Sequence, residues 1–360
     1  MTYKIAFFSS DWLFEIVQEK QNAINQFLND YQDIFIDMFE TFGNYGLVHP
    51  MDSLLELYKL PNIKDYDVLI FQTNSNFYKD YRQQMIEEAH KYHIPVISIN
   101  DPIKDCVYVG TDNQQAIYKL TQTILAERNC QKVAYVSGPM SSREARLRKA
   151  GFLQATKDLE DIQIIEGNWN TIDGQIAGEK LFNHLPELVV CANDNLAHGV
   201  IVYFQQKGLE VGKDVYVTGF DNITIAKASS PRITTISRDY HTITYTALKT
   251  ARDLIMKKKI SIVYTPFKII KGASCGYPIN EKDDYDLKKE YLSYTYHSNC
   301  FFESTERLEI LLSEASNFYD LLDVFEKESQ NFGYKQIYLM MNSKYIDEMS
   351  ENITYFSKTM

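Results

Sequence analysis

The 360-residue sequence has few of the residues that mark disulfide-rich, zinc-binding or membrane proteins. Its five cysteines are odd in number, widely spaced and without a C-x-x-C pair, which argues against a disulfide framework or a structural zinc site. We expect free, buried thiols at Cys106, Cys130, Cys191, Cys275 and Cys300.

No run approaches the roughly 18 apolar residues that span a bilayer. The apolar start of the chain is also too short for a signal peptide. These absences predict a cytoplasmic protein without a membrane partner.

Positive charge is scarce as well. The chain has 37 Lys and Arg against 48 Asp and Glu, a formal net charge of -11. An acidic chain is a poor candidate for wrapping a nucleic-acid backbone by itself, because phosphate binding needs concentrated Lys and Arg. The segment 281–360 alone holds 16 Asp and Glu against 8 Lys and Arg. This asymmetry predicts two units with different roles.

Motifs of the common catalytic chemistries are missing from the sequence. There is no phosphate-binding loop, no G-x-G-x-x-G, no G-x-S-x-G, no H-E-x-x-H and no Gly-Gly-Asp-Glu-Phe run. His90 and His93 are spaced i, i+3, but one such pair is more typical of a surface than of a metal site. We therefore expect no catalytic residues, no cofactor and no bound metal, and the chain is not predicted to be an enzyme.

Short apolar runs alternate with longer amphipathic stretches over most of the chain. Residues 3–8, 68–71 and 133–136 are typical of strands, and residues 113–127 and 196–207 of helices. This alternation predicts βαβ units and parallel sheets that are covered by helices on both faces. The first series is complete by about residue 110, and a second series starts near residue 133.

The predicted fold class is therefore α/β, with two doubly wound parallel-sheet lobes joined by a hinge and a C-terminal α/β extension. In the extension, residues 307–330 predict one long amphipathic helix and residues 335–341 a strand. Two facing sheets would present the carboxyl ends of their strands to one cavity, where ligands of open α/β sheets bind.

Polar side chains follow several strands of the second series. Ser141 and Ser142 precede a helix that carries Arg148, and Asn193 and Asp221 each follow an apolar run. Such groups hold polar or anionic ligands, but helix capping by the hydroxyls and amides is an equally simple interpretation. Trp169 follows a short strand, where its ring would either stack on a ligand or pack in the core.

Taken together, these stretches resemble the ligand-binding core of the lactose-repressor (LacI/GalR) family, whose fold is that of periplasmic sugar-binding proteins. Each motif is weak, but their order and spacing make the set strong over residues 3–277 and densest over 109–238. The matching segments are Val109-Gly110-Thr111-Asp112-Asn113, residues 131–138, residues 145–152, Ala192-Asn193-Asp194, residues 217–222 and residues 231–236.

The resemblance implies a domain division. Residues 1–280 form the two-lobed binding domain, with one lobe at about 1–109 and 240–263 and the other at about 110–238 and 265–277. Residues 281–360 are the extension, which has no counterpart in the simple repressor and is interpreted as the start of a further domain.

The resemblance also implies ligand-binding residues at the matching positions. Arg148 would clamp hydroxyls or a carboxylate, Asn193 and Asp221 would hydrogen-bond the ligand, and Trp169 would stack. The full expected set is Asp11, Trp12, Asn100, Ser141, Arg148, Trp169, Asn193, Asp221 and Arg238. Two positions depart from the family pattern: Asn100 stands where Asp is common, and Arg238 where an uncharged polar group is frequent. Arg238 indicates an anionic or carboxylate-bearing ligand.

The function implied is that of a sensor and transcription regulator. A small polar solute, sugar-like in chemistry, binds between the lobes of a homodimer, and closure is relayed to an output domain. Family repressors begin with a helix-turn-helix, whereas this sequence begins at the first strand of the sensor, so DNA would be bound only through a domain not present in this chain. The alternatives are a sensor for a C-terminal signalling output such as a diguanylate cyclase, a hydrolase acting on sugars or nucleosides, and an assembly module with an empty cleft.

Overall fold

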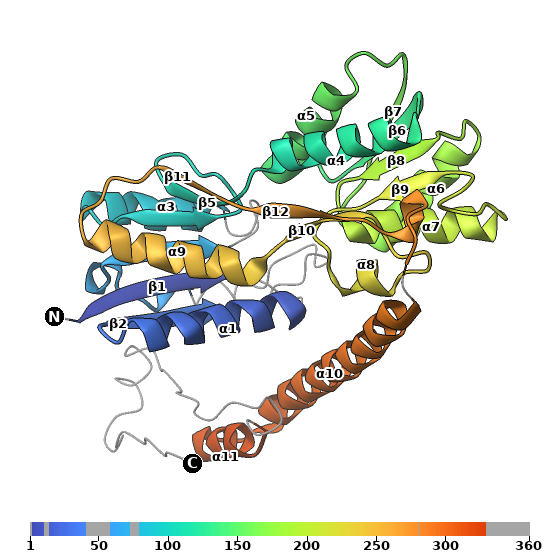
Figure 1. The fold of residues 1–360 in the computed structure, drawn as a ribbon. Helices are drawn as coiled ribbons and strands as arrows, with labels where there is room; N and C mark the ends of the chain where they lie inside the picture. The colour runs from blue at the N-terminus through green and yellow to red at the C-terminus, as the bar shows by residue number, and fades with distance from the viewer. Residues whose placement is uncertain (1, 11–13, 41–57, 73–78, 280, 329–360) are drawn as a thin grey trace, which may run out of the picture. The chain divides into compact units, whose positions relative to one another are not determined.

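The computed structural model describes residues 2–10, 14–40, 58–72, 79–279 and 281–328. The chain divides into two compact units, Met1–Tyr291 and Leu292–Met360. The first unit contains two parallel sheets, each covered by helices (Figure 1). This is the α/β class with two parallel-sheet lobes that the alternation of apolar runs predicts.

The first lobe is built on a six-stranded sheet in the order β11-β5-β4-β3-β1-β2, in which every neighbouring pair is parallel. Its strands are β1 (Tyr3–Ser9), β2 (Ile34–Glu40), β3 (Val68–Gln72), β4 (Val96–Ile99), β5 (Val107–Thr111) and β11 (Ile262–Thr265). Its helices are α1 (Phe14–Asp30), α3 (Lys79–Lys91) and α9 (Tyr240–Ile255), with the short 3-10 turn η1 (Ile63–Asp65).

Both faces of this sheet are buried. Ile5 and Phe7 of β1 belong to a core cluster with α1 and α9, whereas Ala6 and Phe8 belong to a cluster with α3. Successive side chains of a strand point to opposite faces, so a strand that is covered on both sides needs an uninterrupted apolar run. The run from Ile5 to Phe8 meets this requirement, and each of its residues is fully buried.

The second lobe is built on a four-stranded parallel sheet in the order β7-β6-β8-β9. Its strands are β6 (Lys132–Ser137), β7 (Asp161–Glu166), β8 (Leu188–Cys191) and β9 (Tyr216–Thr218). Its helices are α4 (Asn113–Arg128), α5 (Arg143–Ala155), α6 (Thr171–Phe182), α7 (Asp194–Gln206) and α8 (Thr224–Ala228).

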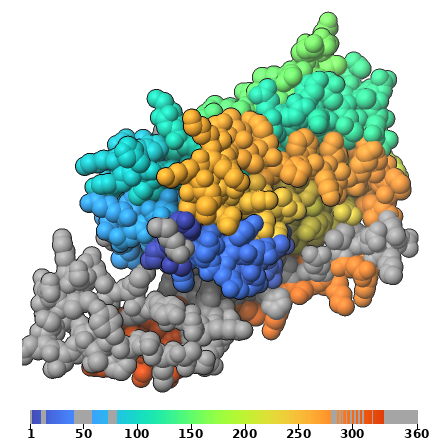
Figure 2. Space-filling view, turned by 60° about the vertical axis from the view of Figure 1, so that its left-hand side comes forward, coloured from blue at the N-terminus to red at the C-terminus, as the bar shows by residue number. Residues whose placement is uncertain are grey.

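An antiparallel pair of strands, β10 (Thr235–Arg238) and β12 (Phe267–Ile270), runs between the two sheets (Figure 1). Bridges from Thr218 to Thr234 and from Asp221 to Ser237 join the β9 end of the second sheet to β10. The 3-10 turn η2 (Ala273–Cys275) follows β12. In Figure 2 the orange atoms near residues 250–275 form one continuous surface.

Helix starts in the second lobe are set by polar side chains. Asp112, Ser142, Asn170 and Asn193 each accept a hydrogen bond from the backbone N–H three residues further on. These caps satisfy backbone donors that a helix leaves unpaired at its first turn. The capping interpretation of Ser142 and Asn193 therefore holds in this structure.

The extension contains α10 (Glu281–Glu314) and α11 (Phe318–Glu328). The prediction of one helix over 307–330 is wrong, because the helix that covers residue 307 starts at Glu281 and ends at Glu314. Asn317 accepts a hydrogen bond from the Asp320 N–H, at 3.1 Å, and thereby begins a new helix after the break. The strand predicted at 335–341 lies outside the described residues.

Candidate functional site

Arg148 is the largest fully buried side chain in the described part of the chain, with 1% of its surface exposed. It lies on α5, and its guanidinium is bound from two other elements. Its Nε donates to Asn113 Oδ1 at the start of α4, and its Nη1 donates to the Ala192 carbonyl after β8, both at 2.7 Å. A guanidinium held in this way directs its remaining N–H groups in one fixed direction.

Four charged residues from three segments meet at this point, and we call them the four-charge cluster: Glu144 and Arg148 of α5, Asp221 of the loop after β9, and Arg238 of β10. Glu144 Oε1 accepts from Arg148 Nη2 at 3.2 Å and from Arg238 Nη1 at 2.9 Å. Asp221 Oδ1 is 2.6 Å from Arg238 Nη2 and 3.8 Å from Arg148 Nη2. Positive and negative groups therefore alternate around the cluster.

The charges of the cluster stabilise one another. Burial alone would raise the pKa of the Glu144 carboxyl, but Arg148 and Arg238 together hold that pKa below its usual value. Burial would lower the pKa of the Arg238 guanidinium, yet Asp221 and Glu144 keep it above its usual value. Both guanidiniums also lie over the Phe220 ring, Arg148 at 3.8 Å and Arg238 at 5.5 Å from its centroid.

The loop that carries Asp221 is held by a neighbouring buried carboxyl, Asp194. Its Oδ2 accepts from the Ile223 N–H at 2.9 Å, and its Oδ1 accepts from the Thr235 hydroxyl at 2.6 Å. Burial raises the pKa of Asp194 well above its usual value, and the nearby Asp221 carboxylate raises it further. Asp221 itself has a positive φ of 109°, a strained backbone conformation that these anchors maintain.

Asn193 and Trp169 lie beside the cluster, but their polar groups are engaged within the chain. Asn193 Oδ1 caps α7 through the Leu196 N–H at 2.9 Å, and its Nδ2 donates to the Trp169 carbonyl at 3.0 Å. The Trp169 ring lies directly over Gly138, where an added Cβ would come within 2.4 Å of the indole. The ring centroid is also 5.5 Å from Arg148 Cζ.

The first lobe contributes a group of polar atoms at the carboxyl ends of its strands. Ser10 follows β1, Asn100 follows β4 and Thr111 ends β5. Within the described part of the chain, the buried atoms Ser10 Oγ, Asn100 Oδ1 and Thr111 Oγ1 have no hydrogen-bond partner. Buried polar atoms are normally paired, so three such atoms at one sheet edge mark this edge as a place where a further polar group fits.

Tyr108 of β5 links this edge to the four-charge cluster. Its hydroxyl donates to the Thr111 carbonyl at 2.8 Å. A Cβ at Gly110 would lie 2.7 Å from both the Tyr108 hydroxyl and Asn100 Oδ1, so the three residues pack closely together. Burial raises the pKa of Tyr108, and Glu144 raises it further, so the phenol stays neutral.

Of the nine residues expected to bind ligand, five lie together on the second-lobe side: Arg148, Trp169, Asn193, Asp221 and Arg238. Asn100 lies at the first-lobe edge. Ser141 is exposed, and its carbonyl accepts from Arg146 Nη1 at 2.9 Å. The remaining two, Asp11 and Trp12, fall outside the described residues.

The sequence analysis missed Glu144 and Glu15. Glu144 lies four residues before Arg148, a spacing that places both side chains on one helix face and would have identified it. Glu15, at the start of α1, accepts hydrogen bonds from the Thr224 N–H at 2.9 Å and the Thr224 hydroxyl at 2.5 Å. These bonds connect the first lobe to α8 of the second, and no local pattern indicates them.

A second contact between the lobes starts at α5. Arg143 Nη1 donates to the Pro102 carbonyl at 2.7 Å, and Pro102 lies in the segment between β4 and β5. The lobes are therefore joined by side-chain hydrogen bonds as well as by the connecting strands.

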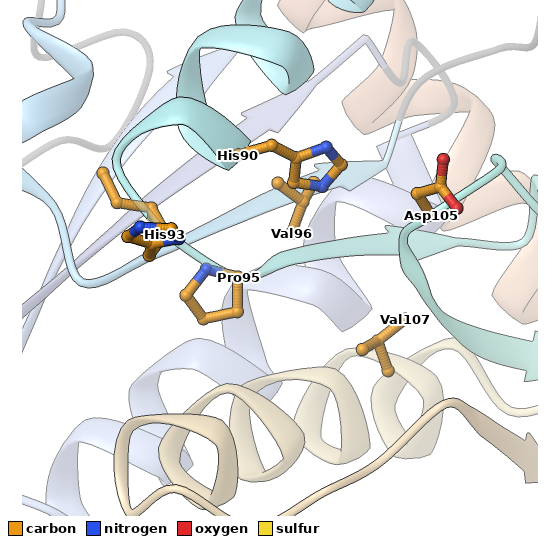
Figure 3. A pocket seen from close by; sticks show the side chains of 7 residues that line it. His90, His93, Pro95, Val96, Asp105 and Val107 are labelled. Atoms are coloured by element: carbon orange, nitrogen blue, oxygen red, sulfur yellow. The ribbon is translucent and has the colours of Figure 1, made fainter.

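Two pockets lie away from this site. The first, of about 350 Å³, is formed by the end of α3 and the starts of β4 and β5, and includes His90, His93 and Asp105 (Figure 3). It is at the sheet edge opposite the carboxyl ends. The second, of about 590 Å³, lies at the end of α7 and includes Gln205 and Arg232. Among the described residues, no group of three or more His, Cys, Asp or Glu side chains is arranged to hold a metal ion.

Two other findings concern the described residues. All five cysteines are free thiols. None of the helices in the described ranges has the length and apolar character that crossing a membrane requires.

Comparison with known proteins identifies this fold. Residues 123–275 match the periplasmic binding protein-like domain family. The "HTH-type transcriptional repressor PurR" of Klebsiella pneumoniae is 28% identical over 190 residues, which cover 51% of this chain and 55% of that protein. The PurR protein of Salmonella paratyphi B is 26% identical over 189 residues, 50% of this chain and 55% of its own length. The chain thus spans about half the length of the curated relatives it matches.

Solved structures agree on the fold. A dimeric Lac repressor superposes with a TM-score of 0.62 at 19% identity, covering 75% of this chain and 98% of that chain. The transcription regulator CcpA of Lactococcus lactis gives 0.62 at 16% identity, with 76% and 99% covered. A periplasmic solute-binding protein of Actinobacillus succinogenes with bound D-allose gives 0.61 at 20% identity, with 74% and 97% covered.

The fold and these matches define a two-lobed periplasmic-binding-protein-like domain. Within that class, the chain is similar to the LacI/GalR type, to which its sequence relatives and the Lac repressor and CcpA structures point.

Proposed function

We propose that residues 1–280 bind a small, polar, sugar-like solute between the two lobes and act as the sensor of a transcription regulator. The observation that carries this proposal is the position of the four-charge cluster. It lies beside Asn100 and Thr111, whose buried Oδ1 and Oγ1 atoms have no partner within the described residues. A ligand rich in hydroxyl groups donates to and accepts from such atoms at once.

Binding at this position would change the balance between open and closed lobes. A ligand that contacts both lobes stabilises the closed arrangement by its extra contacts there, and the connecting strands β10 and β12 serve as the hinge. The Glu15–Thr224 and Arg143–Pro102 hydrogen bonds are the contacts that opening would break. The extension 281–360 would then pass the change to an output.

The relatives support a regulatory rather than a catalytic role. The PurR proteins are named as transcriptional repressors, and the D-allose complex is that of a solute-binding protein. On this basis we assign no catalytic residue, cofactor or metal. As a regulator of transcription, the protein would act in the cytoplasm, where the chromosome lies.

A homodimer is the partner that fits the second lobe. Ile172 and Ile176 of α6 are spaced i, i+4 on one helix face and are 69% and 43% exposed. Exposed apolar residues in register are typical of interfaces. The Lac repressor that superposes on this chain is described as dimeric.

Isothermal titration calorimetry with neutral sugars, including D-allose and D-galactose, tests the proposal. We expect one or more of them to bind without product formation. Asp221→Ala and Arg148→Ala should each weaken that binding by roughly 2–4 kcal/mol, because each removes a charged group that the proposal places against the ligand. Glu160→Ala, at an exposed position of the same lobe, is the control. Unchanged sugar affinity in both site variants would contradict the assignment of Arg148 and Asp221 to the binding site. Accumulation of a reaction product would favour an enzyme.

A further inference from the structure

The four-charge cluster has equal numbers of positive and negative groups. Two guanidiniums, Arg148 and Arg238, face two carboxylates, Glu144 and Asp221. The neighbouring Tyr240 hydroxyl accepts from Arg238 Nη2 at 3.1 Å, and burial raises its pKa, so Tyr240 adds no charge. The formal charge of the cluster is therefore zero.

Glu144 is the member of the cluster that a ligand would meet first. Its side chain is 25% exposed, compared with 2% for Arg148 and 7% for Arg238. Its Oε1 is shared between both guanidiniums, so it occupies the position that the carboxylate of an anionic ligand would take. Both terminal nitrogens of Arg238 are already bound within the chain, Nη1 to Glu144 and Nη2 to Tyr240 and Asp221, and among the described residues only its buried Nε has no partner.

We infer that Glu144 is a specificity-determining residue that makes this site select uncharged, hydroxyl-bearing ligands and exclude anionic ones. The inference rests on the proposed function and names the ligand class of the same site. An anionic ligand would bring a third carboxylate next to Glu144 and Asp221, and like charges at this distance in a buried site repel strongly. A hydroxyl group instead donates to a carboxylate and accepts from a guanidinium. This inference replaces the expectation of an anionic ligand, which was based on Arg238 alone.

Sugars that differ only in charge test the inference directly. The probes are D-glucose, D-glucuronate and D-glucosamine, and the matching set D-galactose, D-galacturonate and D-galactosamine. For the wild-type chain, calorimetry should show that the neutral sugar that binds does so at least about tenfold more tightly than its uronate.

Two variants shift the charge of the site in opposite directions. Glu144→Gln keeps an acceptor for both arginines and gives a net charge of about +1, so the uronate should bind about tenfold or more tightly than it binds the wild type. Arg238→Gln gives about −1, so the amino sugar should gain and the uronate should lose affinity. Glu160→Gln is the matched surface control, and far-UV circular dichroism verifies that each variant is folded.

The outcomes separate the inference from the proposed function. If none of the six sugars binds, the proposed function fails and the inference fails with it. If a uronate binds the wild type more tightly than its neutral sugar, the inference alone is overturned. A folded Glu144→Gln protein that keeps the wild-type ratio of uronate to neutral-sugar affinity also overturns it. Should Glu144→Gln not fold, the wild-type ratio and Arg238→Gln decide the question.

Discussion

Glu15 and Glu144 are two partly buried glutamates of the first unit whose pKa values move in opposite directions. Burial raises the pKa of Glu15, and the hydrogen bonds from Thr224 only partly oppose this effect. Burial acts in the same sense on Glu144, but Arg148 and Arg238 outweigh it and lower the pKa. Glu144 has two guanidiniums against it, whereas the Thr224 hydrogen bonds and the charge of Lys227 do not outweigh the burial of Glu15, which explains the difference.

We expect Glu15→Gln and Glu144→Gln to change the pH dependence of stability with opposite signs. The raised pKa of Glu15 means that the stability of the wild type relative to Glu15→Gln is greatest below the ordinary value of 4.5 and is lost as the pH rises through the folded-state pKa. The lowered pKa of Glu144 means that its contribution is present above 4.5 and is lost as the pH falls through the folded-state pKa.

Urea unfolding of both variants and the wild type between about pH 3 and about pH 7 measures these trends. The surface variant Glu160→Gln corrects for the removal of one carboxylate. Differences from the wild type that run parallel for Glu15→Gln and Glu144→Gln would contradict the opposing environments described above.

At the scale of elements, α6 and α7 pack through glycine. A Cβ added at Gly199 of α7 would lie 2.1 Å from the Thr171 carbonyl oxygen, and one at Gly174 of α6 would lie 2.3 Å from the Leu196 carbonyl oxygen. The obstacles are backbone atoms, which cannot rotate away. This close approach positions the start of α7, where Asn193 binds the Trp169 carbonyl.

Gly199→Ala should therefore destabilise the second lobe by about 1–3 kcal/mol through overpacking, although alanine is the better helix former. Gly178→Ala is the matched control on α6, because its added Cβ meets Tyr203 Cβ at 3.0 Å, a much milder overlap than the one at Gly199. Urea unfolding of both variants should show the larger loss for Gly199→Ala. A loss of stability for Gly199→Ala that is equal to or smaller than that for Gly178→Ala would show that α6 and α7 can move apart without a cost in free energy.

At the scale of the whole molecule, the proposed sensor requires a partner copy. The double change Ile172→Glu and Ile176→Glu should convert a dimer into a monomer, because it places charges in the apolar contact. Sedimentation velocity on wild type and variant measures this. Leu153→Glu, which changes another exposed apolar residue of the second lobe, should leave the dimer intact. A wild type that is monomeric at all concentrations would contradict the homodimer.

Predictions from the sequence worked best where burial is uniform along a segment. The apolar runs at 3–8, 68–71 and 133–136 lie within β1, β3 and β6. The sequence analysis did not predict β2 (Ile34–Glu40), because this edge strand is only half covered and exposes Phe35 at 56%. An edge strand needs no continuous apolar run, so its pattern is weak.

The residues by themselves determine the class of the fold and, through the resemblance, the positions of Arg148 and Asp221. They do so because the alternation of buried and exposed positions is a local property that can be read along the chain. Tertiary structure alone decides which charges meet: Arg238 and Glu144 are 94 residues apart, and Thr224 and Glu15 are 209 apart. Charge balance depends on distances in space, which no local pattern encodes, so the neutral character of the cluster emerges only once the chain has folded.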